Sequence, residues 1–216
     1  MGQTILTSNQ KSVLALVAQE QNLVHFYLSG GTALAEYYLH HRISDDLDFF
    51  ILEKPDQLFL HKFAQEIKEK LGAQNLRYER LYERNQFFFQ FPNAELKVEF
   101  TQYPFPQLDR PTKKDGVLID SMRDIAANKL AAILDRFDPK DFVDLYLLLQ
   151  TTSLETVRKD TEAKFGMKID DVFLGGELAK VRRIEALPKM IKPLAIEELK
   201  TFFANKAKEL SPNILL

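Results

Sequence analysis

The segment LSGGTALAEYYLHHRISDDLDFFI, residues 28–51, decides how the rest of the sequence is interpreted. It follows a β-prone run at 24–28, and Ser29-Gly30-Gly31-Thr32 is a turn signal before a helical pattern at 33–40. A second strand at 47–52 opens on Asp46-Leu47-Asp48 and stops at Lys54-Pro55. The segment therefore predicts a strand, a glycine turn, a helix, and a strand that begins with two carboxylates.

The glycine turn has two interpretations. Glycines allow a tight turn and a close approach of the backbone to a ligand, and the following helix would offer unpaired N–H groups to a phosphate. Gly30, Gly31 and Thr32 are thus candidate phosphate-binding residues. The alternative is a turn with no ligand at all.

Asp46 and Asp48 are two residues apart, so on a strand both side chains lie on one face. At about 6–7 Å and an effective dielectric near 20, their repulsion is roughly 2–3 kcal/mol. Mg²⁺, which prefers oxygen ligands, would remove that cost. The pattern indicates a metal site, and the alternative is a polar strand entry beside the acidic Asp45.

Glu99 supplies a third carboxylate on a later strand, in Leu96-Lys97-Val98-Glu99-Phe100. Leu96, Val98 and Phe100 share one face of that strand, which leaves Glu99 on the other. A neighbouring carboxylate would complete a site for two metal ions and accept the proton of an attacking hydroxyl. A solvated face with a Lys–Glu alternation is the other interpretation.

The remaining pattern predicts an α+β half followed by a helical half. Helices are expected at 9–21 and 57–71, with Gly72 as a C-terminal cap, and strands at 76–82, 86–91 and 96–101. Prolines at 104, 106 and 111 indicate a linker, and helices follow at 121–137, 140–149, 153–165 and 197–210, with Gly175-Gly176 as a helix break. We therefore expect one domain at 1–105, a linker at 106–117 and a helical domain at 118–216.

Composition excludes several kinds of chemistry. The chain has 216 residues, no cysteine, no tryptophan and four histidines, none in a metal-ligand spacing. Thiolate, iron–sulfur and disulfide chemistry are therefore excluded. The net charge of −2 argues against extended DNA binding, and the absence of a signal sequence or a long apolar run predicts a cytoplasmic protein with no membrane association.

Taken together, these motifs resemble the DNA-polymerase-β-like nucleotidyltransferase superfamily and, within it, the AbiEii toxin family. The matching runs are Gly30-Gly31-Thr32-Ala33-Leu34 and the His41-Arg42-x-Ser44-x-Asp46-Leu47-Asp48-Phe49 strand entry. A second block lies in the helical half and comprises Lys129, Arg136, Lys140-Asp141 and Asp144-Leu145. The resemblance covers residues 26–149.

This resemblance implies a polymerase-β-like core, a mixed sheet flanked by helices, and a helical domain that closes the active-site cleft. Asp46, Asp48 and Glu99 would bind metal and, with Lys129, form the catalytic set. Lys129 would face the phosphates of the NTP. The residues expected to bind the NTP are Gly30, Gly31, Thr32, Arg42, Ser44, Lys129, Arg136, Lys140 and Asp141.

Several of those residues have structural alternatives. Arg42 could instead cap a helix, and the Ser44 hydroxyl could reach the loop backbone. Arg136 and Lys140 could serve solubility, and Asp141 suits the first turn of a helix because of the helix dipole.

The expected reaction is transfer of a nucleoside monophosphate from an NTP to an acceptor hydroxyl, with release of pyrophosphate. Its cofactor would be Mg²⁺, as two ions, with Mn²⁺ as a substitute. By resemblance, the role is that of a toxin in a toxin–antitoxin or abortive-infection pair, the acceptor a tRNA or other RNA 3′ end, and the partner a separate antitoxin. Alternatives are transfer to a protein or small molecule, as by AMP-transferring antitoxins or antibiotic-modifying enzymes, and a non-catalytic NTP-binding module.

Overall fold

The computed structural model describes residues 4–210, which divide into two compact units. Unit 1 contains residues 4–38, 44–106 and 110–121, and unit 2 contains 39–43, 107–109 and 122–210. The short segment 39–43 thus folds with residues that follow it by more than 60 positions.

Unit 1 is built on a seven-stranded sheet in the order β3-β4-β5-β2-β1-β7-β6. Pairs β2–β5 and β1–β7 are parallel and the other four pairs are antiparallel. The strands are β1 (Tyr27–Ser29), β2 (Leu47–Ile51), β3 (Asn75–Leu81), β4 (Arg84–Phe91), β5 (Ala94–Gln102), β6 (Thr112–Lys114) and β7 (Val117–Ile119). The mixed sheet confirms the α+β class expected from the sequence.

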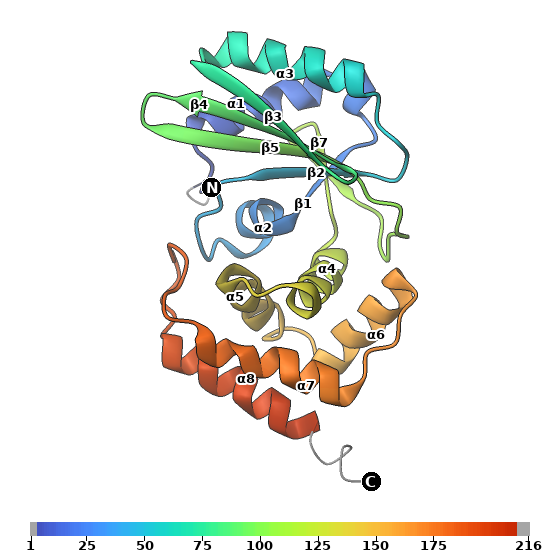
Figure 1. Ribbon diagram of the computed structural model, residues 1–216, viewed down its shortest axis with the longest axis vertical. Helices are drawn as coiled ribbons and strands as arrows, with labels where there is room; N and C mark the ends of the chain where they lie inside the picture. The colour runs from blue at the N-terminus through green and yellow to red at the C-terminus, as the bar shows by residue number, and fades with distance from the viewer. Residues whose placement is uncertain (1–3, 211–216) are drawn as a thin grey trace. The chain divides into compact units, whose positions relative to one another are not determined.

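Helices α1 (Ser8–Gln19) and α3 (Gln57–Leu71) lie on one face of this sheet, and α2 (Gly30–Leu34) lies on the other (Figure 1). The bounds of α3 match the expected ones because local signals mark both ends: Asp56 caps the N-terminus, and Gly72 ends the helix at φ 67°. Beyond α2 the chain continues as a π-helix, Ala35–Leu39, where an ordinary helix was expected.

Aromatic side chains fill the core between the sheet and α3. Phe49 of β2 stacks on Phe100 of β5 at 5.3 Å, and Phe63 of α3 meets Phe100 edge-on. Phe87 and Phe89 of β4 are fully buried as well. Because side chains alternate along a strand, the residues between these phenylalanines lie on the opposite face of the sheet, the face that carries α2.

The linker expected at 106–117 is largely part of the sheet. Residues 112–114 form β6, and Val117 begins β7, which pairs with β1 in parallel. Gly116, at φ 85°, makes the turn between them, and a Cβ there would lie 2.7 Å from Cβ of Ala18. The prolines therefore precede a hairpin, and the division between the units falls at Ser121.

Unit 2 contains five α-helices within the described residues: α4 (Met122–Asp135), α5 (Pro139–Leu148), α6 (Leu154–Phe165), α7 (Asp171–Ala179) and α8 (Ile196–Leu210). Asp138 caps α5, and Pro139 lies in its first turn. Gly175 and Gly176 do not break a helix but lie inside α7, where a Cβ on Gly175 would make ordinary contact with α8, 3.7 Å from the Ala207 carbonyl. In the described part of the chain, no helix is both long and apolar enough to cross a membrane.

Candidate active site

Three central strands of unit 1 align Ser29, Asp48 and Glu99 across the sheet. Ser29 of β1 pairs with Asp48 of β2, and Asp48 pairs with Glu99 of β5. Their neighbours Phe49 and Phe100 point into the core, so the two carboxylates lie on the opposite face. The sheet register thus brings together acids that are 51 residues apart in sequence.

Asp46, Asp48 and Glu99 converge on the ammonium of Lys97. The Lys97 Nζ atom lies 3.1 Å from Asp46 Oδ2, 3.5 Å from Asp48 Oδ1 and 3.5 Å from Glu99 Oε2. Lys97 and Glu99 are two residues apart on β5 and share a face. The two aspartates therefore point to one place, as expected, and that place holds a positive charge.

Gly30 adjoins this cluster, and its lack of a side chain is required there. Its φ is 69°, and a Cβ would lie 3.0 Å from Oδ2 of Asp48. The buried Thr32 donates its hydroxyl hydrogen to the carbonyl of Asp46. The glycine turn thus supports the carboxylate loop from beside it, with Thr32 engaged by the loop backbone.

Helix α1 holds the same loop from a second direction. The buried amide of Gln10 donates to the carbonyl of Ser44 at 2.9 Å and to that of Asp45 at 3.1 Å. Ser44 is itself buried. Side chains of α1 and α2 therefore hold the backbone of the residues that lead into Asp46.

Glu99 is bound on both carboxylate oxygens. Arg84 donates Nε to Oε1 at 2.6 Å and Nη2 to Oε2 at 2.8 Å, and Thr101 and Gln86 donate at 2.7 and 2.9 Å. Burial raises the pKa of this carboxyl, but Arg84 and the two neutral donors outweigh burial and lower the pKa to about 2. Glu99 is therefore a fixed negative charge and a weak base.

The pKa shift of Asp48 has the opposite sign. Burial raises the pKa of the Asp48 carboxyl, Lys97 lowers it, and the charges of Glu99 and Asp46 raise it again, with a net rise. The same carboxylates keep Lys97 charged, because they outweigh the effect of its burial and raise its pKa. The cluster holds three carboxylates against Lys97 and Arg84, so negative charge is in excess.

Unit 2 contains a second ionic cluster, centred on the fully buried Asp144 of α5. Arg42 donates Nε to Oδ1 and Nη2 to Oδ2, each at 2.7 Å. His41 Nε2 lies 2.7 Å from Oδ1, and Lys129 Nζ lies 2.7 Å from Oδ2. The segment 39–43 thus supplies two partners of Asp144.

Asp141, one turn earlier on α5, extends this cluster. Its Oδ1 accepts from Lys129 at 2.8 Å, and its Oδ2 accepts from Nε and Nη2 of Arg136 at 3.1 and 3.0 Å. Arg136 is about half exposed, whereas the Lys129 side chain is 10% exposed. Lys140, also expected to bind the NTP, is exposed on the first turn of α5.

The cations of this cluster set its protonation states. Burial raises the pKa of Asp144, but Lys129, Arg42 and His41 outweigh it and lower the pKa well below the usual range. Burial lowers the pKa of His41 despite Asp144, so the imidazole is neutral, and its buried Nδ1 has no hydrogen-bond partner within residues 4–210. Two carboxylates face Arg42, Lys129 and Arg136, so positive charge is in excess.

The donor set of unit 1 fits one divalent cation. Within residues 4–210, no group of three His, Cys, Asp or Glu side chains is arranged as a preformed metal site. Asp46 and Asp48 nevertheless offer hard oxygen ligands around a position now held by an ammonium. Both Glu99 oxygens already accept hydrogen bonds, so a second ion there would have to replace charge-assisted bonds.

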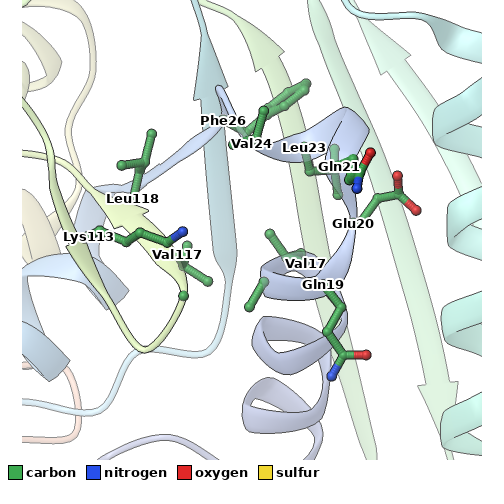
Figure 2. A pocket seen from close by; sticks show the side chains of 12 residues that line it. Val17, Gln19, Glu20, Gln21, Leu23, Val24, Phe26, Lys113, Val117 and Leu118 are labelled. Carbon is green, nitrogen blue, oxygen red and sulfur yellow. The ribbon is translucent and has the colours of Figure 1, made fainter.

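An apolar hollow lies elsewhere in unit 1. It has a volume of about 400 Å³ and is lined by the C-terminal turn of α1, the segment that follows it, and the β6–β7 hairpin. Figure 2 shows Val17, Leu23, Phe26 and Val117 among its side chains, with Glu20 and Lys113 as charged members. Its lining includes no residue expected to bind metal or NTP.

Sequence reasoning missed the two cations of the first cluster. Lys97 was interpreted only as part of a solvent-exposed Lys–Glu alternation. Its spacing of two residues from Glu99 nevertheless indicated that both side chains share a face of the strand. Arg84 pairs with Thr101 across the β4–β5 ladder, and no spacing in the sequence links it to Glu99. In unit 2, Asp144, which the resemblance included in its second block, forms ion pairs with Arg42 and Lys129.

Comparison with solved structures defines the class of protein. A putative nucleotidyltransferase from Helicobacter pylori superposes with a TM-score of 0.63 at 19% identity, over 96% of this chain and 97% of that one. MenT4, a nucleotidyltransferase toxin from Mycobacterium tuberculosis H37Rv, gives 0.50 at 16% identity, over 95% and 86%. The fold is that of the polymerase-β-like nucleotidyltransferases.

Comparison of sequences defines the family. The model of the nucleotidyl transferase AbiEii toxin family, of type IV toxin–antitoxin systems, matches residues 14–212. An uncharacterized protein of Aquifex aeolicus, aq_aa25, is 33% identical over 96% of this chain and 98% of its own length. The chain belongs to the AbiEii family and is a nucleotidyltransferase, as the motifs at 30–34 and 41–49 predicted.

Proposed function

We propose that this nucleotidyltransferase transfers a nucleoside monophosphate from a Mg²⁺-bound NTP to the 3′ end of an RNA, with tRNA as the preferred acceptor. The observation that carries the proposal is the convergence of Asp46 and Asp48, beside Gly30, on one cation position. Two carboxylates on one face, next to a backbone that no side chain covers, suit a metal-bound triphosphate.

Asp46 and Asp48 would hold the metal ion, with Mn²⁺ as a substitute. When bound, that ion supplies positive charge to the phosphate oxygens and lowers the barrier to attack at the α-phosphorus. Gly30 and Gly31 would bind the triphosphate through their backbone, and Thr32 keeps the Asp46 backbone in place. The sequence suggested Glu99 as the proton acceptor, but its pKa of about 2 favours a role as the fixed charge that anchors Arg84 and Lys97.

The positive cluster of unit 2 would serve the leaving group. Arg42, Lys129 and Arg136 together carry one more positive charge than Asp141 and Asp144 neutralise, which suits the charge of pyrophosphate. Arg42 is 1% exposed and bidentate on Asp144, which favours an indirect role for it: it orders the carboxylate that holds Lys129. Lys140 remains a proposed NTP contact.

The proposed biological role is that of a toxin whose activity a separate antitoxin restrains, because the family is one of type IV toxin–antitoxin systems. An RNA end needs only local positive charge, which is compatible with the net charge of −2. A protein or small-molecule acceptor is the alternative.

The test uses each labelled NTP with Mg²⁺ and total cellular tRNA. We expect label on tRNA with the wild-type protein and none with Asp46→Asn or Asp48→Asn. Asp45→Asn is the matched control, since Asp45 is an exposed neighbour outside the carboxylate cluster. Label on a co-purified protein instead of RNA would contradict the RNA proposal and leave nucleotidyl transfer intact.

A further inference from the structure

Lys97 has an unusual position for a lysine next to a proposed metal site. Its ammonium contacts all three carboxylates of the cluster at 3.1–3.5 Å, and its side chain is only 18% exposed. Among residues 4–210, Lys97 is the nearest cation to Asp46 and to Asp48, whereas Glu99 is nearer to Arg84. Lys97 is therefore the counter-ion of Asp46 and Asp48 themselves.

The charges explain why a lysine is placed there. Asp48 and Glu99 are paired across β2 and β5, and Asp46 lies on the same side, so three negative charges share a small part of one sheet face. Without a cation they would repel each other by a few kcal/mol per pair at an effective dielectric near 20. One ammonium relieves much of that repulsion while no metal is bound.

A divalent cation on Asp46 and Asp48 would need the space and the ligands that the ammonium now uses. The metal ion and the Lys97 ammonium cannot occupy this position together, because the repulsion between the two cations at contact distance is large. Lysine differs from arginine in that its flexible four-carbon stem lets the charge move by several ångströms without moving the strand. The Arg84 fork on Glu99, by contrast, is fixed by two bonds.

We propose that Lys97 is a tethered counter-ion that holds the metal position of Asp46 and Asp48 and must leave it when the metal-bound nucleotide enters. This proposal rests on the proposed function and adds a regulation of that site: the lysine weakens the binding of free metal ion. Productive loading then requires the nucleotide, whose phosphates supply further ligands to the ion and a new anionic partner for the displaced ammonium.

The experiment measures Mn²⁺ binding without nucleotide, by electron paramagnetic resonance of the free ion. We expect Lys97→Met to bind Mn²⁺ at least about tenfold more tightly than the wild type, because one competing charge is gone. Lys97→Arg, which keeps the charge, should bind as weakly as the wild type or more weakly. Lys62→Met, an exposed lysine on α3, is the control for the same change in net charge.

The outcomes separate this inference from the proposed function. Unchanged or weaker Mn²⁺ binding in Lys97→Met that is still lost with Asp48→Asn overturns the lysine inference and leaves the metal site in place. No binding in any variant, including Lys97→Met, overturns both.

A measurement on the wild-type protein covers the case in which Lys97→Met does not fold. Amine acylation followed by mass spectrometry reports how accessible the Lys97 ammonium is, with Lys62 as the internal reference. At a Mn²⁺ concentration that fills the site in the binding measurement, we expect labelling of Lys97 to increase severalfold and labelling of Lys62 to stay unchanged. Equal labelling of Lys97 in the metal-free and the Mn²⁺-filled protein would overturn the proposal.

Discussion

The two ionic clusters of this protein are built from the same kinds of side chain in opposite proportion. In unit 1, Asp46, Asp48 and Glu99 face Lys97 and Arg84. In unit 2, two carboxylates, Asp141 and Asp144, face three cations: Arg42, Lys129 and Arg136. The first cluster has a negative charge to offer a metal ion, and the second has a positive charge to offer a phosphate.

The clusters differ as much in burial as in charge. Asp46 and Asp48 have side chains that are 42% and 24% exposed, whereas Asp144 is fully buried and Asp141 nearly so. Exposed like charges cost stability and leave room for a ligand, while buried paired charges support the fold. We therefore expect substitutions in the cluster of unit 1 to reduce activity and substitutions in the cluster of unit 2 to reduce stability.

The largest effect is expected from Asp144→Asn. The change leaves Arg42 and Lys129 buried with one carboxylate fewer, and breaking such a group costs about 3–5 kcal/mol. Urea unfolding should show this loss. Asp138→Asn, which keeps an equally good helix cap one turn away, should change stability by less than about 0.5 kcal/mol. Equal stability of both variants would contradict a structural role for the buried cluster.

Asp48→Asn should show the reverse pattern. Nucleotidyl transfer should fall by about 10²–10³-fold, since a metal ligand is worth several kcal/mol in the transition state. Its melting temperature should stay the same or rise, because burial and the neighbouring acids already disfavour the charged form of Asp48. A variant that lost activity only because it unfolded would remove the distinction between the clusters.

Gly30→Ala tests the close approach of the backbone to Asp48. Alanine at φ 69° costs about 1–2 kcal/mol, and its Cβ would lie 3.0 Å from Asp48 Oδ2. Gly72→Ala is the matched control, with φ 67° and open space around it. Thermal unfolding should show a loss in both variants, whereas activity should fall only with Gly30→Ala. A parallel loss of activity in both would show that the contact with Asp48 is unimportant.

The smallest expected effect is a change of stability with pH that depends on the protonation of one side chain, His41. The pKa of His41 is lowered by burial from 6.5, so below about pH 6.5 the unfolded chain binds a proton that the folded chain does not. Stability is therefore complete above that pH and is lost as pH falls, by at most about 1.4 kcal/mol per pH unit. Denaturation curves between pH 5 and 8 should lose this contribution in His41→Gln and keep it in the control His25→Gln, whose side chain is exposed. Identical curves for the two variants would show that His41 is protonated in the folded state.

Local signals predicted most of the elements of the fold. The helix at 57–71 was placed correctly because Asp56 and Gly72 mark its ends, and α5 because Asp138-Pro139 marks its start. Strands β6 and β7 escaped prediction, since each has three residues and the first is Thr-Lys-Lys. Such strands are defined by their pairing, which a local pattern does not contain.

The acids of unit 1 could be proposed from the sequence, whereas the cations that pair with them could not. Alternation along each strand places Asp46 and Asp48 on one face of the β2 segment and Glu99 on one face of the β5 segment. The parallel pairing of β2 with β5 joins residues far apart in sequence, so no local signal predicts it. Lys129 interrupts the apolar helix α4, so its ammonium needs an anionic partner. Its partners came from α5, in a cluster completed by Arg42, 102 residues before Asp144 in sequence. Only tertiary structure sets that pairing.

The segment 39–43 has a consequence for how the protein is made. Arg42 leaves the ribosome about a hundred residues before Asp144, and the carbonyl of Lys189, which accepts from the Ile43 amide, follows later still. A chain released early would contain the carboxylates of unit 1 with an arginine and a histidine that have not met their partner. A fragment that begins at residue 122 would lack both. A translation product that ends before α5 can therefore contain unit 1 but not a finished unit 2, because His41 and Arg42 still lack Asp144.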